Sequence, residues 1–398
     1  MLNLADIYTD YLIAQNKHAT ATGLADLMPD ELSHDQITRL LNKAPQTSKD
    51  LWLKIKTDVR EYEGLDDGVL ALDDMIAEKP YSDENDIIAW HYDHSKGRTV
   101  KGINILTAMV RYGDVRLPIA YEVIEKTIRY SDLQTKKERR KSSFTKNDLF
   151  LKLLNVAIRN DLKFAYVLVD RWFSSQSNMS YIHNVGKKFI MGIKSNRCVA
   201  LTEKDKENGK YQQLKQISLE DGIPQTVYLK GMAFKVQVMK KTFKNENGKE
   251  SVLYLVTNDL SIDGQPILDT YKKRWSIEEF HKSVKQNSSF EKSPTRIVTS
   301  QLNHIYYSIL GFCRLERLKL KKSLNHFALS TLKKHRSWKL TRGFQFLASV
   351  VAAVITAPIG IPLAIRNACK NHGNFFLYKH HADSELAALK VIDAANNL

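Results

Sequence analysis

The order of strand-like and helix-like segments between residues 68 and 194 limits the folds that this chain can adopt. In order, the segments are an apolar run over 68–74, strand-like runs over 101–113 and 115–124, an amphipathic helix over 145–160, a buried strand over 163–170, a helix around 174–184 and a strand over 187–194. Gly113 and Asp114 separate the two long strand-like runs, which predicts a tight antiparallel hairpin. The resulting order, β-β-β-α-β-α-β, is that of an RNase H-like sheet.

The flanking segments differ in pattern from this core. Short apolar strands separated by polar turns fill 195–259 and predict a β-rich insertion, and helical patterns dominate before residue 64 and after residue 266. The predicted fold class is therefore α/β, with an RNase H-like mixed sheet core, a β-rich insertion, and N- and C-terminal helical regions. Within 1–64, two short helical patterns are broken at Pro29, and Ser33 with Gln36 forms a predicted capping box. This pair fits a helix-turn-helix or an ordinary helical bundle.

Charge is concentrated in one part of the chain. The formal net charge is +16, and residues 271–342 hold 17 Lys and Arg against four acids, a net +13. Such a concentration favours a polyanionic partner, nucleic acid first and an anionic membrane surface second. Residues 346–365 carry no charge over 20 positions, but they include Pro358, Gly360 and Pro362. We interpret this stretch as a buried helix followed by a turn, with membrane contact as the alternative.

The compartment is indicated by the cysteines and the N-terminus. The three cysteines, Cys198, Cys313 and Cys369, are far apart, which favours neither a disulfide framework nor a zinc site. The first residues contain acids and lack a basic region of the kind that begins a signal peptide. We therefore expect a reducing, cytoplasmic location near the nucleoid and no membrane association.

One predicted helix, over 267–286, has a separate polar face. At 100° per residue, five side chains fall within about 80° of arc: Tyr271, Arg274, Glu278, Lys282 and Lys285. The apolar residues Ile277, Phe280 and Val284 fall on the other side and form a packing face. One acid among cations fits a carboxylate that binds a metal beside a phosphate, which Arg grips with two donors and Lys attracts as a point charge.

Two further carboxylates follow apolar runs. Asp73 follows VLAL and Asp170 follows YVLV, and in an RNase H-like sheet those strands would be neighbours, so both acids would emerge at one edge. With Glu278 they would supply three hard oxygen ligands, which suit Mg²⁺. Asp74 directly follows Asp73, and because both acids end the run, strand alternation does not decide between them. We rank Asp73 first.

The spacing of these residues resembles a known family. Tyr271-x₂-Arg274-x₃-Glu278-x₆-Lys285 matches the Y-R-E-K signature of bacterial insertion-sequence transposases of the DDE superfamily, the insertion-sequence-four group. The surrounding YKKRWSIEEFHKSVKQ, and the blocks LVDRWFSS and LALDDMIAEKPY, are also similar to that group. The resemblance spans about residues 69 to 320. Met75 departs from it, standing where the family usually has Thr, which leaves Asp74 open as the alternative first Asp.

The resemblance implies specific roles. Asp73, Asp170 and Glu278 would be the catalytic, metal-binding triad, with Mg²⁺ as cofactor and Mn²⁺ as a substitute. Tyr271, Arg274 and Lys285 would bind phosphates of the transposon end. The substrate would be double-stranded DNA, both the inverted repeats of the element and the target, and the protein would act as a homodimer on paired ends.

Other DNA contacts are expected from residues outside the signature. Lys282 lies on the same predicted helix face, and Lys96, Arg98 and Lys101 lie in a basic loop suited to backbone contacts. Trp172 and Trp275 directly follow cationic residues, and we interpret both as packing aromatics. The insertion contains no Trp, so base flipping is not expected.

The predicted domains are a helical, candidate DNA-binding region over 1–64, the RNase H-like catalytic core over 65–194, the insertion over 195–259, the second part of the core over 260–325, and a C-terminal helical, candidate dimerisation region over 326–398. The predicted function is cut-and-paste transposition by metal-dependent phosphoryl transfer. The main alternative is a catalytically inactive relative that regulates by binding element ends, and a third is a membrane-associated nuclease.

Overall fold

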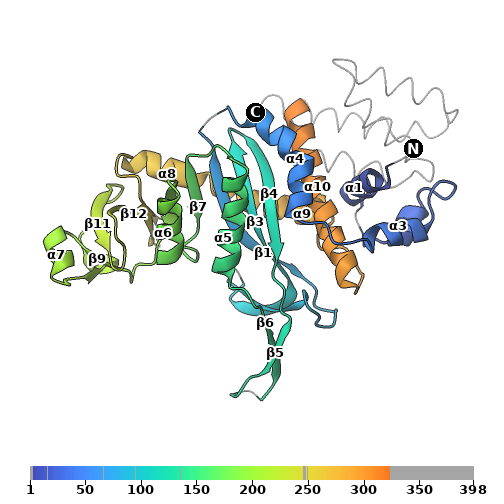
Figure 1. Ribbon diagram of the computed structural model, residues 1–398, viewed down its shortest axis with the longest axis horizontal. Coiled ribbons are helices and arrows are strands. Elements are labelled where there is room, and N and C mark those ends of the chain that lie inside the picture. The colour runs from blue at the N-terminus through green and yellow to red at the C-terminus, as the bar shows by residue number, and fades with distance from the viewer. Residues whose placement is uncertain are drawn as a thin grey trace.

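A computed structural model of the protein describes residues 3–322, apart from 16, 66, 95, 135, 245–247 and 249 (Figure 1). The predicted C-terminal region over 326–398 and the uncharged stretch over 346–365 lie outside the described residues. Among the residues described, no helix is both long and apolar enough to span a bilayer.

The centre of the molecule is a mixed sheet of five core strands. They are β1 (Val69–Glu78), β3 (Arg98–Tyr112), β4 (Val115–Val123), β7 (Tyr166–Val169) and β8 (Lys188–Gly192). β1 pairs antiparallel with β3, which pairs antiparallel with β4, whereas β7 runs parallel to β1 and β8 runs parallel to β7. The spatial order β4-β3-β1-β7-β8 is the RNase H-like arrangement, which confirms the predicted fold class.

Local sequence explains the main turns and helices of this core. Gly113 adopts φ +53° between β3 and β4, in the left-handed region that glycine enters at little cost, and this confirms the predicted hairpin. Helix α5 (Lys146–Arg159) begins at a capping box formed by Thr145 and Asp148. α6 (Gln176–Asn184) connects β7 to β8 in the expected order.

The predicted insertion extends the core sheet. Its strands are β9 (Cys198–Ala200), β10 (Gln212–Gln213), β11 (Gln225–Leu229), β12 (Val236–Lys244) and β13 (Glu250–Thr257), with the short helix α7 (Glu203–Glu207). β13 pairs antiparallel with β8, where Leu255 lies opposite Gly192. With β2 (Ala89–Asp93) on the outer edge of β3, the result is one sheet of 11 strands.

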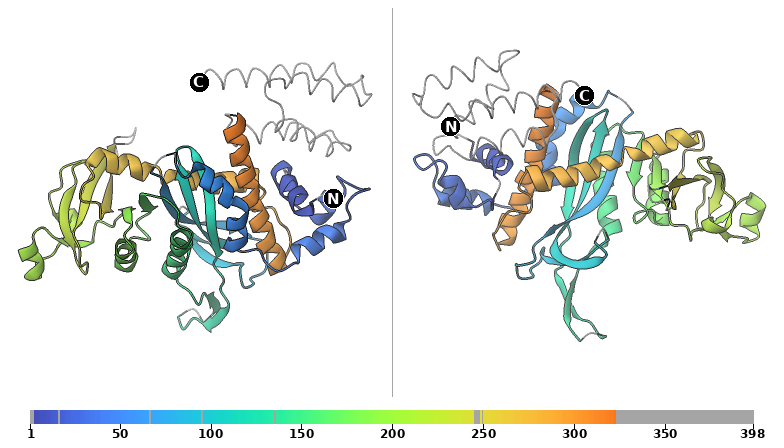
Figure 2. Two further views of the ribbon diagram at one scale, coloured as in Figure 1. Left: turned by 45° about the horizontal axis from the view of Figure 1, so that its top comes forward. Right: turned by 180° about the vertical axis from the view of Figure 1, so that it is seen from behind.

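Helices cover both faces of the sheet. α5 packs against β3 and β4, and α4 (Ser48–Tyr62) packs against β4. α8 (Gly264–Lys272) and α9 (Trp275–Asn287) cross the other face, as the rear view in Figure 2 shows, and α9 contacts β1. Apolar contacts also join the helices: the rings of Phe280 on α9 and Phe312 on α10 (Val298–Lys322) meet edge to face, with their centres 4.8 Å apart.

The N-terminal region is a cluster of helices packed on α10 (Val298–Lys322). It contains α1 (Leu4–Ala14), α2 (Ala21–Ala25) and α3 (His34–Leu41), and both α1 and α3 contact α10. The predicted capping box is present, because the Ser33 side chain accepts from the Gln36 backbone while the Gln36 side chain accepts from the Ser33 backbone. A buried hydrogen bond of 2.9 Å between Tyr8 and His304 joins this region to the core.

The chain also forms a second, smaller sheet. Part of the basic segment over 136–143 is β6 (Glu138–Lys141), which pairs antiparallel with β5 (Ile128–Ser131). This two-stranded hairpin pairs with no other strand of the part that the structure describes, and it projects from the body of the molecule (Figure 1).

Candidate active site

Asp73 and Asp74 lie in the middle of β1, not at its end as expected. β1 continues to Glu78, so successive side chains alternate between the two faces of the sheet. Asp74 faces α5, where its carboxylate lies 2.8 Å from the ammonium of Lys146. Asp73 faces α9 and pairs with Arg274. Strand alternation therefore separates the two acids, contrary to the expectation from sequence.

Asp170 lies level with Asp73 on the neighbouring strand. In the parallel pairing of β1 with β7, Val69 is opposite Tyr166 and Ala71 is opposite Leu168. Continued by two residues, that register places Asp170 beside Asp73. The Asp170 side chain accepts hydrogen bonds from the backbone N–H of Trp172, at 2.9 Å, and of Phe173, at 3.4 Å, so the turn after β7 holds the carboxylate in place.

Glu278 comes from the opposite layer, on a helix that is not continuous. The predicted helix over 267–286 is two helices, α8 and α9, and Arg274 at the join has a helical backbone without continuing the α-helical pattern. Its N–H bonds to the carbonyl of Tyr271, three residues back, which is the tighter 3₁₀ spacing. The join still leaves Tyr271, Arg274 and Glu278 near one another.

Arg274 joins the carboxylates of the two layers. Its Nη1 atom lies 3.3 Å from Oδ2 of Asp73 and 3.3 Å from Oε1 of Glu278. Burial raises the pKa of Asp73 well above its usual range, and the nearby charges of Glu278 and Asp170 raise it further, although Arg274 opposes them. Burial also raises the pKa of Asp170. Carboxylates that repel each other in this way form a site that favours a bound cation.

Tyr271 lies beside Arg274, whose guanidinium carbon is 5.8 Å from the centre of the Tyr271 ring. Its hydroxyl lies 3.1 Å from the position that a Cβ would occupy at Gly192, so the absence of a side chain at the end of β8 lets the ring approach. Burial raises the pKa of Tyr271, and the hydroxyl therefore stays protonated at neutral pH and can donate a hydrogen bond.

His281 is a candidate site residue that sequence reasoning missed. Asp73, Glu278 and His281 each offer one ligand atom, and these atoms lie within 4.8 Å of one another; Asp170 is not in this group. His281 is buried, and its Nε2 atom has no hydrogen-bond partner among the described residues. The sequence contained one indication of its role: a residue three positions after Glu278 in a helix lies on the same helix face.

Of the two α9 lysines expected to contact DNA, the structure engages one within the protein. The ammonium of Lys285 lies 2.6 Å from the carbonyl oxygen of Ile76 and 3.0 Å from the carboxylate of Glu291, so it fastens α9 to β1. Lys282 is exposed on α9.

The basic residues near β2 lie at the same edge of the sheet as the carboxylates. β3 begins at Arg98, and its start pairs with the end of β1, beyond Asp73. Arg98 and Lys101 therefore lie in a strand and not in a loop as expected. Arg98 is exposed, Lys96 pairs with Glu78, and the ammonium of Lys101 lies 5.8 Å from the centre of the Trp90 ring.

Trp172 and Trp275 are not packing aromatics, contrary to the expectation. Trp172 is 41% exposed and Trp275 is 63% exposed. Trp172 follows Asp170 by two residues, and the ammonium of Lys146 lies 5.3 Å from the centre of its ring. A turn rather than the core holds Trp172, so its environment could not be inferred from its residue type.

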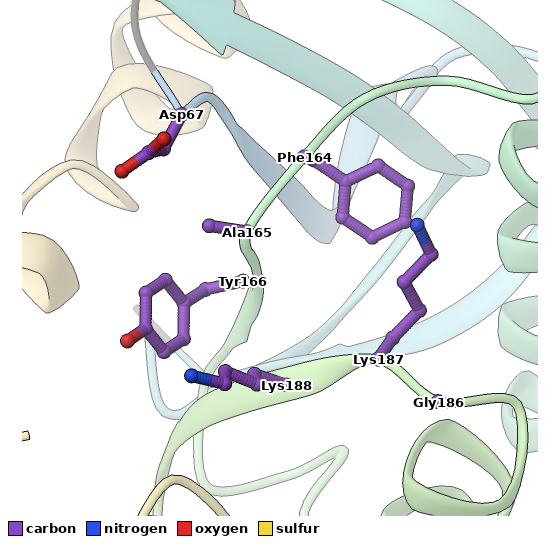
Figure 3. Close-up of a pocket in the computed structure, with 7 residues that line it drawn as sticks. All are labelled: Asp67, Phe164, Ala165, Tyr166, Gly186, Lys187 and Lys188. Carbon is purple, nitrogen blue, oxygen red and sulfur yellow. The ribbon is translucent and has the colours of Figure 1, made fainter. Parts of the chain in front are cut away.

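A separate pocket of about 380 Å³ lies at the opposite edge of the sheet (Figure 3). It is lined by Asp67, Phe164, Ala165, Tyr166, Gly186, Lys187 and Lys188, which precede or begin β1, β7 and β8. Both of its lysines have partners: Lys188 lies 2.8 Å from Asp259, and the ammonium of Lys187 lies over the Phe164 ring. Because the pocket lies where the three strands begin, it is distinct from the carboxylate cluster.

The sheet has the RNase H-like strand order, and the carboxylates of Asp73 on β1, Asp170 after β7 and Glu278 on α9 lie near one another on one face of it. This arrangement is that expected of a nuclease of the RNase H-like class. Comparison with known families is consistent with this class. The family model described as DDE superfamily endonuclease matches residues 2–226, and that described as Transposase DDE domain matches residues 143–310. The chain belongs to the DDE superfamily endonucleases.

Other comparisons add little. No curated protein matches the chain. Among solved structures, an Endonuclease_V from Bacillus subtilis matches with 10% identity and a TM-score of 0.25, covering 60% of this chain and 94% of that chain. That TM-score is too low to support a shared fold, so the RNase H-like assignment rests on strand order and direction.

Proposed function

We propose that the protein is a DNA transposase that cuts and joins the ends of its own insertion sequence by metal-dependent phosphoryl transfer, with Asp73, Asp170 and Glu278 as its catalytic carboxylates. The observation that carries this proposal is the meeting of Asp73 and Glu278, from different layers, around Arg274. The cut-and-paste mode, the insertion-sequence-four grouping and a homodimer on paired ends follow from the Y-R-E-K resemblance. The compartment would be the cytoplasm, where the DNA lies.

The residues present fit a divalent metal. Asp73, Asp170 and Glu278 offer hard oxygen donors, which Mg²⁺ and Mn²⁺ prefer. Burial raises the pKa of Asp73, and the negative charges of Glu278 and Asp170 raise it further, so a bound cation would stabilise the charged carboxylate. Bound there, the metal would lower the cost of forming the attacking hydroxide and would stabilise the leaving oxygen. Among the residues described, His281 adds a nitrogen donor to the same cluster.

The remaining residues of the cluster would orient the substrate. The Arg274 guanidinium, which now pairs with two carboxylates, has planar donors that match the oxygens of a phosphate. The protonated hydroxyl of Tyr271, beside it, would donate to a second phosphate oxygen. Together they would hold the DNA backbone against the carboxylates.

Replacing one carboxylate tests the proposal. Glu278→Gln keeps the shape of the side chain but removes its charge, so we expect DNA cleavage to fall by about a thousandfold or more while DNA binding persists. The measurement is cleavage in Mg²⁺ of a duplex carrying the sequence that flanks the gene, with binding measured in parallel.

The neighbouring acid supplies a matched control. Glu279 is 52% exposed and pairs with Arg116 on β4, away from Asp73. Glu279→Gln should leave cleavage within about twofold of the wild type, because an exposed ion pair contributes little to stability. If the wild type and both variants all failed to cleave DNA, the proposed catalytic activity would be contradicted. The alternative, an inactive relative that occupies element ends, would then be favoured.

A further inference from the structure

The hairpin formed by β5 and β6, called here the β5–β6 arm, is a basic projection that the proposed site does not use. Between residues 126 and 144 the sequence holds seven Lys and Arg against two acids, Asp132 and Glu138. All four residues of β5 are exposed, as are three of the four in β6. Figures 1 and 2 show the arm extending beyond the body of the molecule.

Such a hairpin contributes little to folding by itself. A two-stranded hairpin that packs on nothing else is at best marginally stable in water. The arm is held at its base, where Arg140 lies 3.1 Å from Asp86 and donates a hydrogen bond to the backbone carbonyl of Lys126. Its projection into solvent is therefore more simply explained by a partner than by the stability of the fold.

The charges of the arm are only partly neutralised. The arginines have acidic partners: Arg129 lies 3.4 Å from Glu138, and Arg139 lies 2.9 Å from Asp132. Three exposed lysines form no ion pair with any residue that the structure describes: Lys136, Lys137 and Lys141. Their ammonium groups are available to a polyanion.

The arm leaves the sheet at the same edge as the carboxylate cluster. β1 and β4 both run antiparallel to β3, and β7 runs parallel to β1. The three strands therefore point the same way, and β4 ends at the edge where Asp170 follows β7. After the arm, the chain enters α5, whose first residue, Lys146, contacts both Asp74 and the ring of Trp172. DNA lying on the carboxylates would therefore pass close to the base of the arm.

The dimensions of the arm also suit DNA. A two-stranded β-ribbon fits the major groove, which is about 12 Å wide. At about 3.3 Å per residue, residues 128–133 would reach about 20 Å, roughly six base-pair steps. One face of the ribbon presents Tyr130, with the ammonium of Lys141 5.6 Å from its ring centre.

We propose that the β5–β6 arm binds duplex DNA beside the cleavage site, through contacts of Lys136, Lys137 and Lys141 with backbone phosphates. This proposal rests on DNA as the substrate of the carboxylate cluster. Lysine is a point charge without the paired donors that read a base, so the contacts would not depend on sequence. The arm would thus fix the position of the duplex rather than recognise the element end.

Charge removal in the full-length protein tests the arm. The variant combines Lys136→Gln, Lys137→Gln and Lys141→Gln, and the probe is a 40-base-pair duplex of random sequence without divalent metal. We expect binding to weaken by about tenfold at 0.15 M salt, and the slope of log affinity against log salt to fall by about 2 to 3, because each phosphate contact contributes about 0.9.

A control variant removes the same charge elsewhere. Lys204, Lys210 and Lys215 are exposed in the insertion, and none forms an ion pair within the described residues. Replacing all three with Gln should change affinity less than twofold. The proposal would be overturned if the arm variant bound DNA with the affinity and salt dependence of the wild type. It would also be overturned if the arm variant and the control variant lost DNA affinity equally.

The same measurements separate this proposal from the catalytic one. Binding is measured without divalent metal and therefore without cleavage. A wild-type protein that binds the duplex but never cuts it would contradict the proposed catalytic activity and leave the proposed DNA binding by the arm intact. If the wild type does not bind duplex DNA, both proposals fail. If the arm variant loses self-association without DNA, by sedimentation, while DNA binding is unchanged, the arm docks a second copy and the proposal is overturned.

Discussion

At the scale of the residue, Asp73 and Asp74 show how adjacent identical side chains acquire different environments. Asp73 contacts Arg274 beneath α9, whereas Asp74 pairs with Lys146 of α5. Burial and then the neighbouring carboxylates raise the pKa of Asp73, whereas Asp74 has a cation 2.8 Å away. Substituting each by asparagine should therefore have opposite consequences.

For Asp73→Asn we expect loss of cleavage by about a thousandfold, together with higher stability in the absence of metal. A carboxyl whose pKa is raised by folding costs stability once the pH exceeds its unfolded pKa, and the cost grows until the pH passes the folded pKa, above which it is constant. The melting temperature should thus rise by about 2 °C at pH 7.5 and not change below about pH 3.5. Calorimetry across that pH range measures the difference.

Asp74→Asn is the matched control. It removes the partner of Lys146, so the melting temperature at pH 7.5 should fall, while cleavage should stay within about tenfold of the wild type because this side chain faces away from Glu278. Loss of cleavage in Asp74→Asn alone would reverse the assignment and make Asp74 the catalytic acid.

The sequence predicted the residue types of the site better than their surroundings. Spacing and apolar runs identified Asp73, Asp170 and Glu278 as a group, and the structure brings Asp73 and Glu278 together with the charge of Asp170 nearby. It did not separate Asp73 from Asp74, because β1 continues past the apolar run that appeared to end it. Nor did it find His281, since a buried histidine and a ligand histidine look alike without their neighbours.

At the scale of the element, Lys285 links α9 to β1. The helical wheel placed it on a face with other cations, and the resemblance to the Y-R-E-K signature implied a phosphate contact; neither included the partner strand. In the structure its ammonium contacts the Ile76 carbonyl and Glu291. The 3₁₀ join at Arg274 could not be foreseen either, because nothing in YKKRW, neither Pro nor Gly, marks a break.

Replacing Lys285 by methionine should therefore reduce stability as well as activity. The change keeps the apolar stem but removes both polar contacts, which we expect to lower the free energy of unfolding by about 1–2 kcal/mol in urea denaturation. Lys272→Met, in α8, removes only an exposed pair with Asp269 and should cost less than about 0.5 kcal/mol. Equal stability of Lys285→Met and the wild type would leave phosphate binding as its main role.

At the scale of the whole molecule, the insertion and the core share one sheet. Sequence indicated strands in 195–259 but not their partners, because alternation defines which face of a strand is buried and not which strand lies beside it. β13 extends the core by pairing with β8. The N-terminal helices were likewise predicted with their capping box, but their packing on α10 depends on contacts between distant parts of the chain.

A shared sheet predicts cooperative unfolding of the core and the insertion. Hydrogen exchange should protect Val256 of β13 as strongly as its partner Met191 of β8, because neither strand can open without exposing the other. The β5–β6 arm is an internal control, since its amides should exchange early. An earlier, separate transition confined to residues 195–259 would show that the insertion is an independent unit.

The pairing of β1 with β3 has a final consequence for how this chain tolerates change. Ten consecutive residue pairs, from Val69 with Arg111 to Glu78 with Gly102, fix the register. A slip of one position would turn Asp73 toward α5 and Asp74 toward α9. For this strand the number of residues therefore matters as well as their identity: a substitution alters the contacts of one side chain, whereas a single-codon insertion or deletion before Asp73 would turn both acids to the opposite face of the sheet.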